Sequence, residues 1–416
     1  MERVKKMSLT TKAIVAMIIG YIFGVIAGET IVPFFDTIGQ IFVNLLFMVA
    51  TPFIFCSIVM GVASMSDLKK TGRIGLKTVG LYAVTTIMAA LVGLGIAGLV
   101  GPGRGFTMEL QEAVVSDKAV PTIGSTLIAM VPKNIFEALT NMTLMQIIVF
   151  AVFLGVSLVL LGEKKKPVTD FFETMVSALI KMTEIVMKTV PLGVFSLMAV
   201  TGASYGPEAL LSISKVLLTD YLSFFIQVFI IMGSMLLIFA RVNPLTFVRR
   251  CGAVISMAMS TTSSSATLPL TIRTATEKLG VPEEVAGFTL PLGATINLNG
   301  AAINIAVCVL FSAQVFNLDF TITEMFALIF TTCITAVGVA GMPGSAIVFT
   351  LAILAQFGIP TEAYALVIAV YRLIDMGMTP VNILGDLACT TTVSQLEKVL
   401  DRSVWETGSG KDGKAA

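Results

Sequence analysis

The chain has 416 residues, of which 56% are hydrophobic and only 13% are charged. Soluble domains carry about a quarter charged residues, so this composition excludes an ordinary soluble domain and predicts a polytopic membrane protein. The formal net charge is +1, from 27 basic and 26 acidic side chains. Without a long basic run, the chain has no electrostatic footprint for nucleic acid.

Histidine is absent from the sequence, which excludes imidazole metal sites and enzyme mechanisms that need a histidine base. The five cysteines are scattered through apolar segments without a C-x-x-C pair, and we expect neither disulfides nor a metal site from them. One string, Gly202 to Gly206, fits the G-x-S-x-G nucleophile elbow, but its serine has no base and we expect a loop there. The chain is therefore not expected to be an enzyme.

Apolar segments of the length that crosses a bilayer, about 20 residues, recur along the chain. We predict crossings near residues 12–28, 38–65, 76–101, 121–162, 172–200, 208–240, 283–312 and 363–397. Two further apolar segments, 243–272 and 321–360, are interrupted by Ser260–Ser265 and by Gly338–Ser345. Polar or Gly/Pro-rich backbone at membrane depth is tolerated only where protein buries it or where it lines a cavity, so both segments are expected to be re-entrant hairpins.

The basic residues fall on alternate connections, as the positive-inside rule requires of a correct set of spans. They cluster at residues 3–6, 69–73, 164–166, 241–278 and 398–402. The protein is therefore expected in the plasma or inner membrane of the cell. Both of its termini are expected to face the cytoplasm. The first hairpin would then enter from inside and the second from outside, which places a binding site between their tips.

The last predicted span carries polar groups that a plain crossing avoids, because a charge at the bilayer centre costs at least about 2.5 kcal/mol. At about 100° per residue, one helix face presents Asp375, Met378, Thr379, Asn382 and Asp386. A solvated helix end or hydrogen bonds between helices would also explain these residues. The apolar flanks of the span favour a binding face.

The seventh predicted span is interrupted at Gly293–Gly300, a stretch that contains Thr295, Asn297 and Asn299. Unwound backbone in mid-span frees carbonyl oxygens, which can coordinate a hard cation together with amide and carboxylate oxygens such as those of Asp386. A simple kink is the alternative.

Together these motifs resemble the glutamate transporter homologue family, which comprises sodium-coupled symporters of dicarboxylates and amino acids. The motifs are Thr261–Pro269, Asn297–Gly300, Gly341–Gly344, Asp375–Thr379 and the following Asn382 and Gly385–Asp386. The resemblance covers roughly residues 8–400. It implies an all-α membrane protein with eight transmembrane helices and two opposed re-entrant hairpins, built from inverted repeats, that works as an elevator in a homotrimer.

The resemblance also implies a fixed scaffold and a moving transport domain. Residues 1–74 and 102–202 would form the scaffold, and residues 75–101 and 203–400 the transport domain. Residues 401–416 are expected to be a disordered cytoplasmic tail.

Three sodium sites are implied by the family motifs, with Na⁺ as the coupled ion. The first maps to Gly293, Asn297, Asn382 and Asp386. The second uses main-chain carbonyls of Thr295, Leu298, Ala336, Val337 and Val339. The third maps to Thr85, Thr86, Asn297 and Asn299. The family keeps an acid where this chain has Asn299, and one carboxylate fewer is expected to weaken that third site.

The implied substrate site lies on the same elements. Asp375, helped by Thr379, matches the family's ligand for a substrate ammonium, and Asn382 with the backbone at Ser264 matches its ligands for the α-carboxylate. Met342 of the second hairpin is a further expected contact. Members that carry acidic substrates add an arginine and a threonine, and the corresponding positions here are Met376, Met378, Thr262 and Ala301.

A substrate carboxylate without an arginine partner would bear an uncompensated desolvation penalty. The sequence therefore favours symport or exchange of a small neutral amino acid such as serine, alanine or threonine, with an acidic amino acid or a dicarboxylate as the alternative. Arg372 bears on this choice, because it could pair with Asp375, anchor the helix at the interface or act as a relocated carboxylate partner. An ion channel would explain the buried polar groups but not two opposed hairpins.

Overall fold

The computed structural model describes residues 9–64, 73–108, 131–141, 143–338 and 344–407. Within these ranges the regular elements are all helices, and no strand occurs. Five helical stretches of the described residues are long and apolar enough to cross a membrane, or six when one bent pair is taken as a single span; in this count Thr11–Met60 and Glu283–Val315 are each one stretch. The expected all-α fold is confirmed.

The first two expected crossings are helices α2 (Leu9–Ala27) and α3 (Val32–Ser64). A 3-10 turn, Gly28–Ile31, joins them and reverses the chain. Gly28 has a φ of +66°, a left-handed conformation that only glycine adopts without steric cost. This turn makes α3 begin at Val32, earlier than residue 38 where the hydropathy pattern places it.

The prediction of a single fourth crossing over 121–162 is wrong. Its described part contains a short helix, α7 (Ile135–Thr140), and a separate helix, α8 (Leu144–Leu160). The Asn134 side chain accepts a hydrogen bond from the Phe136 amide and thereby caps the start of α7. Residues 121–130 lie outside the described ranges.

The fifth expected crossing, 172–200, is also not one straight helix. It consists of α9 (Lys166–Met187) and α10 (Val190–Ser204), with a bend of 53° at the break between them. Pro191 lies in the first turn of α10, and proline cannot donate the hydrogen bond that would continue α9. Because α10 extends to Ser204, the G-x-S-x-G string ends a helix and is not the loop that we expected.

The sixth crossing is continuous, as predicted for 208–240. It begins as α11 (Gly206–Ile226) and continues through the π-helical turn η4 (Gln227–Met232), the helical turn α12 (Gly233–Met235) and a second π turn, η5 (Leu236–Ala240). The third crossing is α5 (Arg73–Val100), which packs against α11. π-Helical turns are rare and concentrate at functional sites, which draws attention to Gln227 at the start of η4.

Two pairs of helices occupy the segments where hairpins are expected. After the short helix α13 (Pro244–Arg250), α14 (Gly252–Thr261) and α15 (Ser264–Leu279) pack against each other across a turn at Thr262, whose φ is +49°. The second pair is α18 (Ile322–Gly338) and α19 (Ser345–Gln356), which also pack together. The connection of this second pair contains Gly341, Met342 and Pro343 and lies outside the described residues.

The seventh crossing is broken where the sequence predicts. α16 (Glu283–Ile296) and α17 (Asn299–Val315) are separated by Asn297 and Leu298, which are not helical. The eighth, α20 (Glu362–Leu396), is one helix of 35 residues, and α21 (Arg402–Thr407) follows it.

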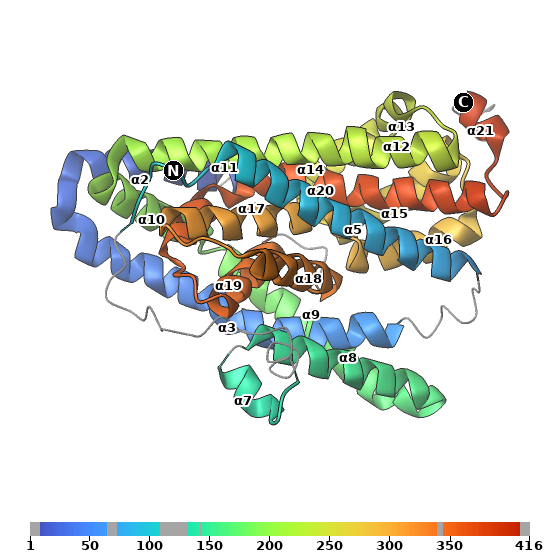
Figure 1. Cartoon of the computed structure of the whole chain (residues 1–416), viewed down its shortest axis with the longest axis horizontal. Helices are drawn as coiled ribbons and strands as arrows, with labels where there is room; N and C mark the ends of the chain where they lie inside the picture. The colour runs from blue at the N-terminus through green and yellow to red at the C-terminus, as the bar shows by residue number, and fades with distance from the viewer. Residues whose placement is uncertain (1–8, 65–72, 109–130, 142, 339–343, 408–416) are drawn as a thin grey trace, which may run out of the picture.

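In space the long helices α5, α11 and α20 lie together along the long axis of the molecule, and α3, α8 and α9 form a second group (Figure 1). The pair α18 and α19 lies between the two groups and contacts α3. α17 packs on both α5 and α20 and is buried along almost its whole length. The polar faces of α17 and α20 therefore meet in the interior of one group.

Candidate functional site

The polar residues of α20 form one buried face. Asp375 and Asp386 are each only 2% exposed, and Met378, Thr379 and Asn382 between them are buried as well. Because α20 is helical throughout, the file of polar groups predicted from the sequence exists in the structure. A solvated helix end does not explain it, since the whole file is inside the protein.

Both helix pairs, α14 with α15 and α18 with α19, reach the Asp375 end of this face. The backbone amide of Gly344, which precedes α19, donates to Asp375 Oδ2 over 3.3 Å, and the Thr379 hydroxyl donates to Oδ1 over 3.1 Å. At the tip of the first hairpin, the Thr262 hydroxyl accepts a hydrogen bond from the Arg372 guanidinium. The two helix pairs thus converge on one short stretch of α20.

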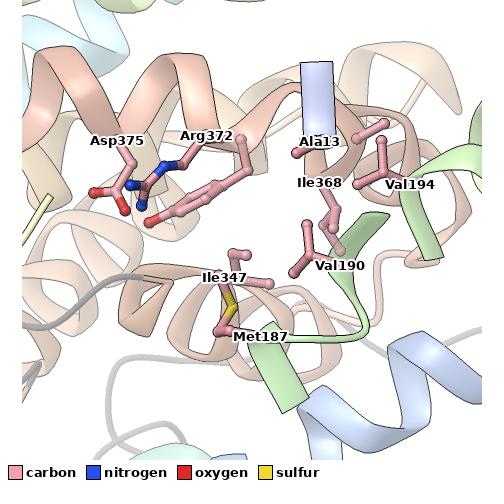
Figure 2. A pocket seen from close by; sticks show the side chains of 10 residues that line it. Ala13, Met187, Val190, Val194, Ile347, Ile368, Arg372 and Asp375 are labelled. Carbon is pink, nitrogen blue, oxygen red and sulfur yellow. The ribbon is translucent and has the colours of Figure 1, made fainter. Parts of the chain in front are cut away.

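Arg372 and Asp375 line a cavity, and the guanidinium lies beside the carboxylate (Figure 2). Tyr371 lines the same cavity. The rest of the wall is apolar and is formed by Ala13, Met187, Val190, Val194, Ile347, Ile368 and Ala369. Several of these residues belong to α2, α9 and α10, so the cavity opens between α20 and helices that the sequence assigns to the scaffold.

The remaining expected substrate contacts surround this region. Ser264, at the start of α15, is 2% exposed, and its hydroxyl has no hydrogen-bond partner within the protein. The Asn382 amide oxygen accepts a 2.7 Å hydrogen bond from the Gly300 amide. Ala301 is buried next to Gly300, and Met342 lies outside the described residues. A ligand would therefore meet one unsatisfied hydroxyl and one amide that already has a partner.

The first expected sodium set comes together around Asp386. Asn297 Nδ2 donates to Asp386 Oδ1 over 2.8 Å. A Cβ placed on Gly293 would lie 2.5 Å from the same oxygen and 2.6 Å from the Tyr82 hydroxyl. Gly293, Asn297 and Asp386 are therefore in direct contact, and only glycine fits at position 293. Asn382 lies one helical turn before Asp386.

The third expected set also assembles. The Thr85 hydroxyl donates to Asn297 Oδ1 and the Thr86 hydroxyl donates to Asn299 Oδ1, each over 3.1 Å. Asn299 is fully buried, and its amide nitrogen has no hydrogen-bond partner. The amide at position 299 thus places an unsatisfied donor where a carboxylate would place an acceptor.

The second expected set is only partly within the described residues. Leu298 lies in the non-helical break, Thr295 precedes it in the last turn of α16, and Ala336 and Val337 lie in the last turn of α18. α16 packs against α18, so the two backbone stretches lie on neighbouring helices. Val339 lies outside the described residues.

The structure adds buried polar residues that the sequence analysis did not use. The Tyr82 hydroxyl donates to the Thr289 carbonyl over 2.9 Å, and Gln227 Nε2 donates to the Thr85 carbonyl over 3.0 Å. Asp220 on α11 is fully buried beside Asn304. Asp220 and Gln227 are polar residues in the middle of a predicted span, and this signal was available in the sequence.

The family model for the sodium:dicarboxylate symporter family matches residues 9–396. The chain belongs to this family. It is 33% identical over 94% of its length to a proton/sodium-glutamate symport protein of Geobacillus stearothermophilus, covering 95% of that protein. It is 32% identical over 97% of its length to a C4-dicarboxylate transport protein of Paraburkholderia phymatum, covering 96% of it. A proton/glutamate-aspartate symporter of Escherichia coli is 29% identical over 95% of the chain, with 94% of that symporter covered.

Membership of this symporter family confirms the family that the motifs indicate, and it identifies the chain as a membrane transporter and not an enzyme. Sodium, the ion expected from the resemblance, is the ion for which the family is named.

Proposed function

We propose that this symporter couples sodium to the transport of an acidic amino acid, aspartate or glutamate. The names of the relatives favour the acidic alternative over the small neutral amino acid that the sequence favoured. The observation that carries the proposal is the position of Arg372. Its guanidinium bonds to Thr262, one of the positions at which the family resemblance places the arginine of acidic-substrate members, and lines the cavity that Asp375 shares.

The chemistry of the cavity suits a ligand with both signs of charge. A guanidinium offers a carboxylate two parallel hydrogen bonds, and the Asp375 carboxylate suits an ammonium group. Ser264 and Asn382 are the proposed partners of the α-carboxylate. A C4-dicarboxylate has no ammonium group and would be repelled by Asp375, so we place the dicarboxylates of some relatives second.

The proposed sodium ligands are the groups around Asp386 and Asn297. Sodium prefers hard oxygen donors. This region offers a carboxylate, amide oxygens, the hydroxyls of Thr85 and Thr86 and the broken backbone at Leu298. The third set lacks its carboxylate at Asn299 and is proposed as the weakest.

For the transport step we propose an elevator movement of residues 75–101 and 203–400 against a homotrimeric scaffold. The two helix pairs would re-enter the membrane from opposite faces, with both termini in the cytoplasm. The cavity supports this division, because one wall is α20 and the other is α2, α9 and α10.

The substrate proposal is tested by Arg372→Ala. Charge-assisted hydrogen bonds contribute about 1.5–3 kcal/mol, so L-aspartate affinity is expected to fall by about 10- to 150-fold, while L-serine binding does not weaken. Calorimetry in sodium buffer measures both ligands, and Arg273→Ala, which removes an exposed arginine of α15, is the matched control. A wild type that binds L-serine more tightly than L-aspartate would restore the neutral-substrate reading.

A further inference from the structure

A buried carboxyl lies outside the proposed substrate and sodium sites. Asp220 on α11 is 0% exposed. None of the ion pairs in the described part of the chain includes it. A charged carboxylate in this position would be expensive to bury without a cation, so its protonation state needs a physical explanation.

The partner of Asp220 is an amide on α17. Asn304 Nδ2 donates to Asp220 Oδ2 over 3.0 Å and contacts the Cys308 sulfur at 3.2 Å. Asp220 Oδ1 and Asn304 Oδ1 have no hydrogen-bond partner. If the acid is ionised, burying this pair with two unsatisfied oxygens costs free energy.

One added proton removes the part of this cost that comes from burying a charge. A neutral carboxyl group has an O–H donor, and a rotated Asn304 amide presents its oxygen to that donor. The Cys308 thiol then donates to the same amide oxygen. A sodium ion is a poor occupant of the same place, because a hard cation needs several oxygen ligands and the contacts of Asp220 supply one carboxyl and one amide.

Among the described residues, no positively charged side chain interacts electrostatically with Asp220. The titratable groups that interact electrostatically with it are Tyr221 on α11, Cys308 on α17, and Tyr364 and Tyr371 on α20. The interactions described for Asp220 include no charged group of α5, α10 or η4. Tyr371 also lines the substrate cavity, and its buried hydroxyl has no hydrogen-bond partner. Tyr371 therefore lies on the cavity wall and also interacts electrostatically with Asp220.

We propose that Asp220 is a proton-binding site, separate from the sodium ligands, and that the chain carries one proton on this carboxyl with each substrate. The transport half of the proposal rests on the proposed function, whereas the binding of a proton at Asp220 does not. Asn304 is the positioning residue, because its amide can bond to the carboxyl in either protonation state.

The proton itself is detected without any substrate. Infrared difference spectra of the purified protein, recorded between low and high pH, are expected to contain the C=O stretch of a buried carboxylic acid. Asp220→Asn should remove one component of this band, and Asp220→Glu should shift it. Asp319→Asn, which removes an exposed carboxyl between α17 and α18, should leave the component in place. An unchanged band in both Asp220 variants would overturn the proposal.

Proton movement is measured in proteoliposomes loaded with a pH-sensitive dye. In the wild type, sodium-driven L-aspartate uptake should acidify the lumen. Asp220→Asn is a permanently neutral mimic, so it should keep sodium-driven uptake and lose the acidification. If this variant still acidifies the lumen as much as the wild type does for each aspartate taken up, proton transport on Asp220 is refuted. If the wild type takes up no aspartate, the substrate proposal fails, while the infrared result still decides proton binding.

Discussion

At the scale of single residues, the side chain of Asn299 bears on the strength of the third proposed sodium site. Its amide oxygen accepts a hydrogen bond from Thr86, but its nitrogen is buried without a partner. A carboxylate in the same position would offer two acceptor oxygens and a full negative charge. Burying that charge costs desolvation free energy. This cost is offset only when a sodium ion is bound beside the carboxylate.

Asn299→Asp should therefore bind sodium more tightly, by about tenfold or 1.4 kcal/mol, and should be less stable than the wild type when sodium is absent. Thermal unfolding at a series of sodium concentrations measures both effects. Asn243→Asp is the control, because Asn243 is exposed and caps α13, a role that aspartate also fulfils. Equal sodium dependence in the wild type and Asn299→Asp would exclude position 299 from a sodium site.

The carboxylate of Asp386 is expected to be indispensable for sodium binding at the first proposed site. Asp386→Asn keeps the shape of the side chain next to Asn297 but removes the charge that attracts the ion. Sodium should then raise the unfolding temperature less than it does in the wild type, whereas Asp170→Asn, at an exposed ion pair of α9, should behave as the wild type does. Undiminished sodium stabilisation in Asp386→Asn would disprove the assignment of this residue.

At the scale of helices, the sequence predicts elements well where polar residues interrupt apolar runs. The break at Asn297 and the polar face of α20 were predicted for this reason. The sequence predicts helices poorly where backbone geometry, and not a polar residue, interrupts the helix. The bend before α10 arises at Pro191, inside an apolar run whose hydropathy is continuous. In the same way α7 ends at Thr140 and α8 begins at Leu144, within a segment that hydropathy treats as one crossing. The direction of the Arg372 side chain depends on the distant Thr262, which helical periodicity cannot supply.

Close packing of α2 on α10 gives a prediction at this scale. A Cβ on Gly24 would lie 2.0 Å from the Ala199 carbonyl oxygen, whereas a Cβ on Gly80 of α5 meets no atom within 4 Å. Glycine costs about 1 kcal/mol relative to alanine inside a helix. Gly80→Ala should therefore leave the unfolding temperature unchanged or raise it, and Gly24→Ala should lower it, because α2 must move away from α10. Similar unfolding temperatures for the two variants would contradict this packing.

At the scale of the whole molecule, the proposed elevator requires the two groups of helices to slide past each other. Phe53 on α3 and Phe349 on α19 face each other across the boundary, with ring centroids 6.4 Å apart. Phe55 on α3 and Phe172 on α9 have centroids 5.8 Å apart, but both belong to the proposed scaffold. The first contact must break during an elevator movement, and the second must not.

Replacing each pair with cysteines, in a chain whose native cysteines have been removed, allows mercuric ions to bridge the two thiols. The Phe53→Cys/Phe349→Cys bridge should stop aspartate uptake and leave sodium stabilisation intact, because the proposed sodium ligands around Asp386 lie within one group of helices. The Phe55→Cys/Phe172→Cys bridge should leave uptake unchanged, since it joins parts that do not move relative to each other. Undiminished uptake with the first bridge formed would rule out a movement of α19 past α3 and, with it, the proposed division into scaffold and transport domain.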